Sequence, residues 1–413
     1  MCNRTVIDSL SLLPRDTLLC LAFSGGMDST VLLHALKQAQ VQFSVYHINH
    51  GLSPHADAWA EQITALCNAL SIPITCITLT TKPAVGESVE AWAREARYAA
   101  LIEAIPANRV LLTAHHEGDQ AETVLLQLMR GAGPKGLSGI APIKRLCRKK
   151  NIHVHRPLLS VSKKAIEAYA KEHALTWVED ESNVQLRFER NFMRHEALPL
   201  LASRVPHVME SLARSASHLQ EQQALVEMFV SSMLPSLQGS KPGTLSIERL
   251  LALPEITLKA VLRHWLGEHD VRMPSPKKLE TIITTVLKAA EDAQPRVCID
   301  EHVIVRYRDT LYIVSQEQLR SLSDYHVEWD PREELCLPHG AGTLCADDLT
   351  KAGIDVAEGE KVHVRFRQGG ETVFVPGVGH QPLKKWFQSH DIPVWERERV
   401  PLVYLNGIMH IIL

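Results

Sequence analysis

The sequence predicts an α/β fold for the N-terminal half of the chain, a doubly wound parallel sheet, followed by a helical domain and a small α+β domain. Three observations lead to this prediction. Short apolar runs alternate with amphipathic stretches through the first two hundred residues, a glycine-rich turn follows the first run, and the strand pattern stops near Pro206. A chain of 413 residues is also too long for one ordinary core, so several domains are expected.

Five apolar runs in the first part of the chain are predicted to be strands of a parallel sheet. In chain order they are residues 18–23, 42–47, 74–79, 109–114 and 153–158. Between them, apolar residues recur at helical spacing over residues 28–38, 56–70, 88–105, 119–130 and 162–173. This alternation predicts helices packed on a parallel sheet.

Beyond Pro206 the pattern changes from strands to long helices. Helical periodicity covers residues 208–232, 256–266 and 276–290, and short runs at 296–299, 303–307 and 311–314 predict a closing hairpin or meander. We expect a loop at 198–206 and a linker at 324–334. The last segment has strand-like runs at 362–366, 402–405 and 408–412 around a helix at 382–388. The predicted domains are therefore 1–205, 206–325 and 326–413.

Composition and charge narrow the class of protein. The chain has 45% hydrophobic and 22% charged residues, as soluble globular proteins do, and its net charge of -3 gives no global attraction to nucleic acid. Any site for a polyanion must then be a local patch. The eight cysteines form no CxxC pair and no zinc spacing with histidine, and no apolar run approaches the length of a membrane span. We expect a cytoplasmic protein without structural zinc.

The turn from Ser24 to Ser29, SGGMDS, links the first predicted strand to the first predicted helix. Glycines let backbone N–H groups approach an anion, and the helix N-terminus adds partial positive charge. The turn lacks the lysine with which the Walker loop stabilises transfer at the γ phosphate. It therefore suits a nucleotide cleaved at its α phosphate, with Asp28 available for a metal. The alternative is a plain tight turn whose Asp28 favours the helix dipole.

Together with later motifs, this turn resembles the PP-loop of ATP pyrophosphatases and, more narrowly, the tRNA(Ile)-lysidine synthetase family. The motifs that carry the resemblance are SGGMDS (24–29), HINHGL (47–52), EAWAREARY (90–98), TAHHEGDQAETVLLQLMRGAG (113–133), RPLL (156–159), DESN (180–183), RNFMRHEALP (190–199), RQGGE (367–371), HQPLKKWFQ (380–388) and IPVWERERVPL (392–402). The resemblance covers essentially the whole chain. Each motif alone is moderately specific, whereas their joint order is very specific.

The resemblance implies a ligase that forms a carbon–nitrogen bond on RNA. Members of this family use ATP to activate the wobble cytidine in the CAU anticodon of tRNA(Ile), and then join the side-chain amine of L-lysine to C2. The products are lysidine, AMP and pyrophosphate, and the tRNA changes from Met to Ile specificity. The resemblance also implies Mg²⁺ at the phosphates and tRNA contacts in the last two domains. The sequence leaves the oligomeric state open, a homodimer included.

The resemblance assigns roles to the residues of the ATP loop and of the HHEGDQAE segment. The predicted ATP-binding residues are Ser24, Gly25, Gly26, Met27, Asp28 and Ser29. Asp119 and Glu122 lie three residues apart on one helix face, where they are candidates to bind lysine or, for Asp119 together with Asp28, the metal. Both acids could instead only favour the helix dipole. The family pattern often has a second acid where this chain has Gly118, so a role that needs both carboxylates is in doubt.

Basic residues and histidines complete the predicted site. His115 and His116 follow a strand at its carboxyl end, where they could donate to nucleotide oxygens, help to deprotonate the amine, or be structural. Arg94 and Arg130 suit phosphate contact but could be solvated ion pairs. The predicted catalytic residues are Asp28, His115, His116, Asp119, Arg94 and Arg130.

The run KRLCRKK at 144–150 places five basic side chains in seven positions, just after the glycine-bearing loop RGAGPKG at 130–136. It suits a loop that follows RNA phosphates, although such runs are often only solvated connections. The predicted tRNA-binding residues are Lys144, Arg145, Arg148, Lys149, Lys150, Arg190, Arg194, Lys384 and Lys385. Trp386 and Trp395 are predicted to be core residues of the small C-terminal domain.

Other functions agree less well with the sequence. A PP-loop sulfur transferase usually needs catalytic cysteines near the site, whereas only Cys20 lies close to these motifs, inside a predicted buried strand. An amide-forming synthetase for a small metabolite would not explain the basic run or the C-terminal module. A non-catalytic tRNA-binding protein would not need an intact SGGMDS turn.

Overall fold

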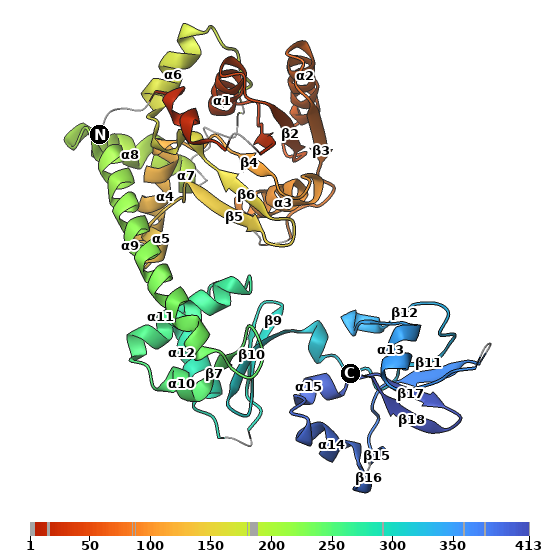
Figure 1. Ribbon diagram of the computed structural model, residues 1–413. Helices are drawn as coiled ribbons and strands as arrows, with labels where there is room; N and C mark the ends of the chain where they lie inside the picture. Colours follow the sequence, from red (N-terminus) through yellow and green to blue (C-terminus); the bar gives the residue numbers. More distant parts are fainter. Residues whose placement is uncertain are drawn as a thin grey trace. The chain divides into compact units, whose positions relative to one another are not determined.

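The computed structural model describes residues 5–14, 17–84, 86, 88–179, 181, 189–290, 293–357, 360–375 and 377–412 (Figure 1). The chain forms two compact units, Met1–Leu225 and Val226–Leu413. The division between them falls inside one helix, α9 (Val208–Leu237). The predicted boundaries after residues 205 and 325 stay predictions. In the described part of the chain, no helix is both long enough and apolar enough to span a bilayer.

The N-terminal unit is built on a six-stranded sheet with the strand order β3-β2-β1-β4-β6-β5. Its strands are β1 (Leu19–Ala22), β2 (Phe43–Asn49), β3 (Ile74–Thr78), β4 (Val110–Leu112), β5 (Ile143–Cys147) and β6 (Ile152–His155). All neighbouring strands are parallel except β5, which pairs with β6 in a hairpin. The five predicted strands are confirmed. Strand β5 was missed, because charges on an exposed edge strand conceal its alternation.

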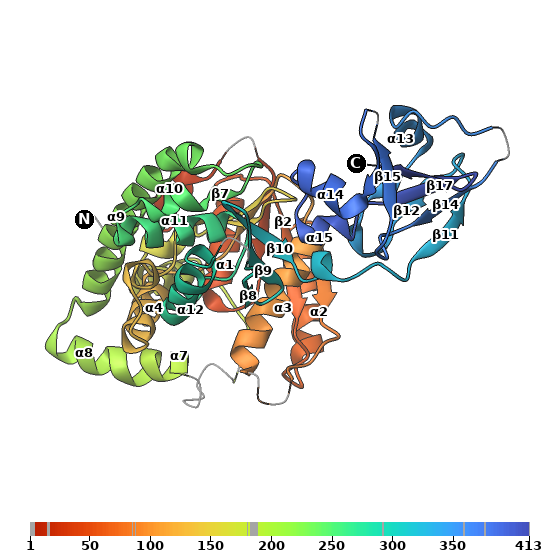
Figure 2. The same cartoon turned by 90° about the horizontal axis from the view of Figure 1, so that it is seen from below.

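Helices cover both faces of this sheet, as Figures 1 and 2 show. Helices α1 (Met27–Gln38), α2 (Ala56–Ala69) and α6 (Lys163–Glu172) pack on the face that includes Leu21 and Leu112. Helix α3 (Val89–Ala104) packs on the opposite face, which includes Cys20 and Leu111. Consecutive strand residues thus enter different cores, as the two-residue repeat of a strand requires. The predicted doubly wound fold is confirmed.

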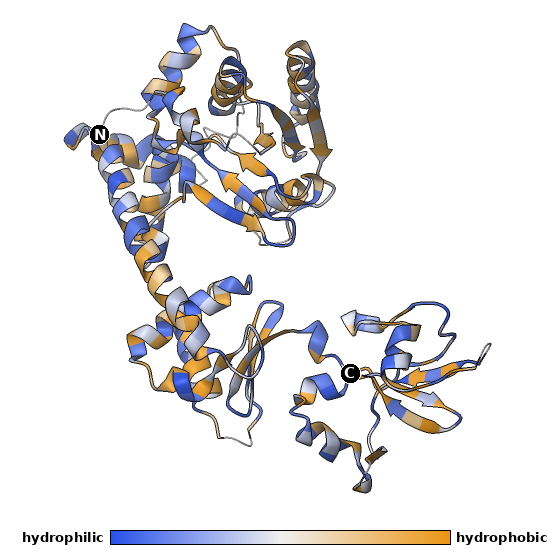
Figure 3. Ribbon diagram, in the orientation of Figure 1, coloured by the Kyte–Doolittle hydropathy of each residue, from blue (hydrophilic) through white to orange (hydrophobic). Residues whose placement is uncertain are grey.

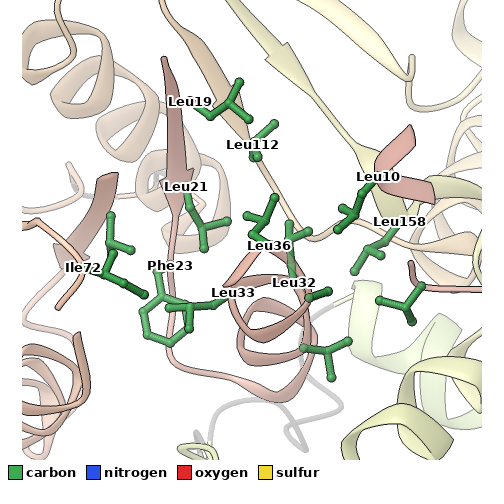
Figure 4. Packing of buried hydrophobic residues seen from close by; sticks show 14 of the residues in the cluster. Leu10, Leu19, Leu21, Phe23, Leu32, Leu33, Leu36, Ile72, Leu112 and Leu158 are labelled. Atoms are coloured by element: carbon green, nitrogen blue, oxygen red, sulfur yellow. The ribbon is translucent and has the colours of Figure 1, made fainter. Parts of the chain in front are cut away.

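The larger of the two cores fixes α1 against the centre of the sheet. Leu32 and Leu36 of α1 lie beside Leu21 and Leu112 (Figure 4), and all four side chains are fully buried. The strands at the centre of the sheet are largely hydrophobic, whereas the helices alternate hydrophobic and hydrophilic positions along their length (Figure 3). This packing holds the β1–α1 connection, which contains the SGGMDS turn, in one conformation.

Helices also connect the sheet to the end of the unit. They include α4 (Glu117–Met129), α5 (Pro134–Leu137), α7 (Glu189–Phe192), the π-helical turn Met193–Ala197 and α8 (Leu198–Arg204); the short helices Asp8–Leu12 and Pro157–Ser160 are 3₁₀. The loop expected at 198–206 is wrong over most of its length, because α8 occupies it. Leu198 is buried at 2% exposure, so the segment has a core contact that its proline conceals in the sequence.

The C-terminal unit begins with a helical layer on an antiparallel sheet. The helices are α10 (Ile247–Leu251), α11 (Glu255–Glu268), α12 (Pro276–Thr281) and a π-helical turn, Ile282–Leu287. The sheet has the order β7-β10-β9-β8, formed by β7 (Leu245–Ser246), β8 (Arg296–Ile299), β9 (His302–Tyr307) and β10 (Thr310–Ser315). The predicted helices and meander are confirmed here.

The last part of this unit is an α+β module. Its main sheet has the order β11-β14-β17-β18, with β11 (His326–Trp329), β14 (Val362–Arg365), β17 (Leu402–Leu405) and β18 (Ile408–Ile411). Smaller elements are β12 (Leu335–Cys336), β13 (Thr343–Leu344), β15 (Thr372–Val375), β16 (Gly379–Pro382), α13 (Ala346–Lys351), α14 (Leu383–Ser389), α15 (Val394–Arg397) and the 3₁₀ turns Glu317–Leu319 and Pro338–Gly340.

Two expectations for this module have clear outcomes. The linker expected at 324–334 is wrong in part, because β11 lies within it and Trp329 is buried at 4% exposure. The core position of Trp386 is confirmed, whereas Trp395 lies against the β9–β10 strands and not in the core of the small domain. Trp386 packs with Phe387 and neighbouring apolar residues, and Trp395 packs edge-on against Tyr312.

Candidate active site

The SGGMDS turn forms an open anion site at the start of α1. Gly25 has a φ of +83°, a left-handed conformation that favours glycine, and a Cβ there would lie 2.7 Å from Ile63 Cδ1. Gly26 is the N-cap residue of α1, so the first N–H groups of the helix have no helical partner. The Ser24 and Ser29 hydroxyls lie 3.1 Å apart beside them. Backbone amides and two hydroxyls can therefore bind phosphate oxygens together.

A capping arrangement at the start of α4 brings His116 to the same place. The Gly118 N–H donates to His116 Nδ1 at 2.9 Å, and the His116 N–H donates to Asp119 Oδ2 at 2.9 Å. Because Nδ1 accepts, the neutral imidazole carries its proton on Nε2. That atom lies 3.6 Å from Asp28 Oδ2 and 3.7 Å from Asp119 Oδ2. His116 thus joins the phosphate-binding turn to the acids of α4.

Glu122 and Asp119 are held by two arginines from a segment about seventy residues further along the chain. Arg190 Nε donates to Glu122 Oε2 at 2.9 Å, and its Nη2 lies 3.3 Å from Asp119 Oδ1. Arg194 Nε donates to Glu122 Oε1 at 2.6 Å, and its Nη2 lies 3.2 Å from Asp119 Oδ1. Glu122 is only 2% exposed, so its charge needs these partners.

Electrostatics fix the charge states of Asp119 and His115. Burial alone would raise the pKa of Asp119, but His116, the charge of Arg190 and the hydrogen bond from the His116 N–H hold it at about 2. Burial lowers the pKa of His115 to about 3, and the charges of nearby arginines, Arg94 among them, act in the same direction. Asp119 is therefore ionised at neutral pH. His115 is uncharged, which suits a hydrogen bond to a nucleotide better than removal of a proton from an ammonium group.

The chain matches known proteins over most of its length. Family models match it as a PP-loop domain over residues 5–201, a TilS substrate binding domain over 245–312 and a TilS substrate C-terminal domain over 362–412. A tRNA(Ile)-lysidine synthase from Coxiella burnetii is 42% identical over 94% of this chain and 86% of its own length. The same enzyme name belongs to relatives from Edwardsiella ictaluri, 40% identical over 94% and 88%, and from Histophilus somni, 37% identical over 96% and 94%.

The chain belongs to the tRNA(Ile)-lysidine synthase family. The family predicted from the motifs is confirmed, as is the PP-loop fold of the N-terminal unit. The roles of individual residues in this lysidine synthase homologue stay predictions. The structure shows which of these residues lie close together.

Two predicted catalytic arginines lie in different places. Arg94 is close enough to His115 to lower its pKa. Arg130 is the C-cap of α4 and lies eleven residues after Asp119, which is about 16 Å along the helix axis. The structure therefore does not bring Arg130 to the group formed by Asp28, His116 and Asp119.

The predicted tRNA-binding residues also separate into several environments. Arg190 and Arg194 are paired with acids inside the site, as described above. Lys150 Nζ donates to the carbonyl oxygens of Ile102 and Glu103, at 2.9 and 2.6 Å, at the C-terminal end of α3. The remaining members are exposed, on β5, on the turn after it and on α14; they are Lys144, Arg145, Arg148, Lys149, Lys384 and Lys385.

Two further residues contribute to this site, and neither was predicted from the sequence. Lys163, in the first turn of α6, places its Nζ 2.7 Å from Asp28 Oδ1. A lysine at a helix N-terminus opposes the helix dipole, and this unfavourable position was an available signal of function. Gln120 on α4 accepts from the Ile140 N–H at 2.6 Å and donates to the Ile140 carbonyl at 3.2 Å, which fixes the chain just after α5.

The arrangement fits a hard divalent cation. Asp28 and Asp119 present carboxylate oxygens to one region beside the phosphate site, and Mg²⁺ prefers one or two carboxylates together with substrate phosphates and water. Among the described residues, no group of three or more His, Cys, Asp or Glu side chains could hold a metal by itself. A cation here would therefore depend on a bound nucleotide to complete its ligands.

Proposed function

We propose that this chain catalyses the ATP-dependent formation of lysidine on tRNA(Ile). The observation that carries the proposal is that one imidazole, His116, lies within 3.7 Å of both Asp28, in the phosphate-binding turn, and Asp119, in the acidic pair. An activated nucleotide and an amine would thus meet at one place. The family membership of the chain supports the same reaction.

The first step is adenylation of the base. The C2 carbonyl oxygen of the wobble cytidine attacks the α phosphate of ATP, and pyrophosphate leaves. The amides at the start of α1 and the Ser24 and Ser29 hydroxyls orient the phosphates. Mg²⁺ bound by Asp28 and Asp119 would supply further positive charge at the phosphates. Lys163 balances the charge of Asp28 beside them.

The second step is attack by lysine. Its side-chain nitrogen forms the bond to C2 after losing a proton, and AMP leaves with the bonding electrons. Asp119 and Glu122 bind the ammonium groups of lysine, because ionised carboxylates form strong hydrogen bonds to such donors. Arg190 and Arg194 already occupy these acids. Lysine must therefore replace at least part of the arginine contacts when it binds.

The C-terminal unit binds the body of the tRNA in this proposal. The exposed Lys384 and Lys385 on α14 offer contacts to the phosphate backbone. A cavity of about 660 Å³ in the same unit is lined by polar, aromatic and aliphatic side chains, including Lys241, His269 and Ile313. We place the enzyme in the cytoplasm, where the free thiols of the seven cysteines in the described part of the chain agree with reducing conditions. The oligomeric state stays open, a homodimer included.

The test is lysine transfer with purified protein. ATP, Mg²⁺, labelled lysine and unmodified tRNA(Ile) with a CAU anticodon should give labelled RNA and AMP. Asp28→Ala should lose both products, whereas Glu167→Ala, which removes an exposed acid from α6, should keep them. AMP without labelled RNA would exclude lysine as the nucleophile. Neither product from a folded protein would refute the proposed function.

A further inference from the structure

Four cations gather on the α3 face of the sheet, apart from the phosphate-binding turn. They are Arg94, Arg97, Lys144 and Arg156, which we call the cationic cradle. None of the four forms an ion pair with a carboxylate anywhere in the described part of the chain. Every acid of the active site, in contrast, has a cation beside it.

Helical spacing places two members of the cradle over the sheet. Leu101 of α3 is 1% exposed and packs on the strands together with Tyr98. Arg97 lies four residues before Leu101, and Arg94 lies four residues before Tyr98, so both share the helix face that meets the sheet. Arg94 Cζ lies 5.6 Å from the centre of the Tyr98 ring. The apolar end of this face anchors α3, and the cationic end extends to the carboxyl edge of the sheet.

Strand register places the other two members on the same face. Lys144 pairs with Val154, and the Arg156 N–H donates to the Pro142 carbonyl at 2.9 Å. Lys144 and Arg156 are therefore diagonal neighbours on one face of the β5–β6 hairpin. Val154 belongs to the apolar core beneath α3, which identifies that face. Arg145 pairs with His153 and points to the opposite face. Of these two residues predicted to bind tRNA, the register therefore leaves only Lys144 in the cradle.

The cradle is accessible and is not neutralised. The side chains of Arg94, Arg97 and Lys144 are exposed. Arg156 is 6% exposed, and its Nη1 donates to the Ala141 carbonyl at 2.6 Å, whereas no described residue accepts from its buried Nε. Loss of surrounding water and the charges of Arg156 and Arg94 lower the pKa of Lys144. Mutual repulsion among buried or crowded cations is unfavourable unless an anion offsets it. These groups thus point to a ligand with several negative charges.

The position of the cradle distinguishes it from the ATP site. It lies where β2 and β6 end, because Arg97 Nε contacts His50 Nε2 at 3.3 Å just after β2 and Arg156 follows β6. Ligands of open α/β sheets bind at this edge. The ATP turn leads into α1, which covers the other face of the sheet. The cradle therefore lies beside His115 at a place that is separate from the phosphate-binding turn.

We propose that the cationic cradle binds backbone phosphates of the single-stranded anticodon loop next to the base that is modified. This inference rests on the proposed function, because that reaction brings an unpaired RNA segment to this edge of the sheet. Phosphodiesters of unpaired RNA can follow a groove of basic side chains without base-specific contacts. Pyrophosphate has similar chemistry, so the test separates the two sources.

The test compares two neighbouring residues on opposite faces of one strand. Lys144→Gln, Arg97→Gln and the double variant are measured against Arg145→Gln, which removes the same charge. The Kd for unmodified tRNA(Ile) is measured over a range of salt concentrations without ATP, and the Kd for ATP is measured without RNA. Both substituted cradle residues are exposed, and thermal melting confirms that each variant folds.

We expect Lys144→Gln to raise the Kd for tRNA about tenfold and to reduce the salt slope by about one, with a larger rise in the double variant. Arg145→Gln should raise it less than threefold, and the Kd for ATP should stay within twofold of wild type. Equal losses from Lys144→Gln and Arg145→Gln would overturn the proposal, as would weaker ATP binding with unchanged RNA binding. Lysine transfer by the wild type, measured in parallel, decides the proposed function separately.

Discussion

The acidic and the basic sides of this site are organised in opposite ways. On the acidic side, Asp28 contacts Lys163, and Asp119 and Glu122 contact Arg190 and Arg194. On the basic side, the cationic cradle has no carboxylate partner among the described residues. A cationic substrate must therefore compete with arginines of the protein, whereas an anionic substrate enters a site that is already unneutralised. Only a cation that binds these carboxylates better than the arginines do can therefore occupy the acidic side.

The largest expected effect comes from removing one charge on the acidic side. Glu122→Gln keeps the shape of the side chain but loses a buried, charge-assisted contact worth about 2–3 kcal/mol. We expect kcat/KM for lysine to fall about 100-fold. Pyrophosphate release from ATP and tRNA without lysine should fall much less, because adenylation precedes attack by the amine. Steady-state kinetics of both reactions provide the measurement.

The matched control is Glu117→Gln, which alters an acid in the first turn of the same helix. Glu117 is not among the residues that contact Arg190 or Arg194. Its variant should keep kcat/KM for lysine within a few-fold of wild type. An equal loss of adenylation and lysine transfer in Glu122→Gln would show that the acid does not act selectively on the amine.

A smaller effect is expected from Gly118, where the family pattern often has an acid. A Cβ at this position would lie 2.7 Å from His116 Cε1, so Gly118→Ala must turn the imidazole away from Asp28 and Asp119. We expect kcat to fall about tenfold. Stability should change little, because alanine favours a helix over glycine by about 1 kcal/mol and offsets the lost cap. Thermal melting and single-turnover kinetics separate these two effects.

Gly267→Ala is the control for Gly118→Ala. Gly267 is also helical, and a Cβ there would meet no atom within 4 Å. It should stabilise the protein slightly and leave kcat as it is. If Gly118→Ala also leaves kcat as it is, then the position of His116 between Asp28 and Asp119 does not matter for catalysis.

His115 lies between the two sides, and its charge state gives a pH-dependent prediction. Burial lowers its folded-state pKa to about 3, from its ordinary value of 6.5, so the unfolded chain binds a proton that the folded chain does not. Stability is therefore lost as the pH falls below 6.5, by about 1 kcal/mol between pH 6.5 and 5.5. Urea unfolding of His115→Gln should show a smaller loss over this interval. The same loss in both proteins would contradict a neutral, buried His115.

Sequence reasoning reached the features that depend on local pattern. The strand, the SGGMDS turn and α1 follow one another directly, so their order and the phosphate site at Gly26 were visible without the fold. The i,i+3 spacing of Asp119 and Glu122 likewise predicted that they share a helix face. These features need only neighbouring residues.

The features of the site that could not be predicted from the sequence depend on contacts between distant segments of the chain. Nothing in the local pattern of Arg190 or Arg194 shows that they meet acids about seventy residues earlier in the chain. For the same reason Lys144 and Arg145 looked alike, because only the register of β5 on β6 places them on opposite faces. Neighbouring residues of a strand point to opposite faces, so Lys144 and Arg145 have different expected roles. The run of charged residues concealed the two-residue repeat of this strand.

The smallest expected effect concerns Lys150, which belongs to the same basic run as Lys144 but whose ammonium group is already hydrogen-bonded within the protein. Its Nζ donates to three carbonyl oxygens at the end of α3, those of Ile102, Glu103 and Ile105. A cation at a helix C-terminus stabilises it by about 0.5 kcal/mol, so Lys150→Met should lower the free energy of unfolding by that amount in urea. The exposed Lys149→Met should change it less. If Lys150→Met weakened tRNA binding as much as Lys144→Gln, then hydrogen bonds to the protein would not distinguish structural cations from cations that bind RNA.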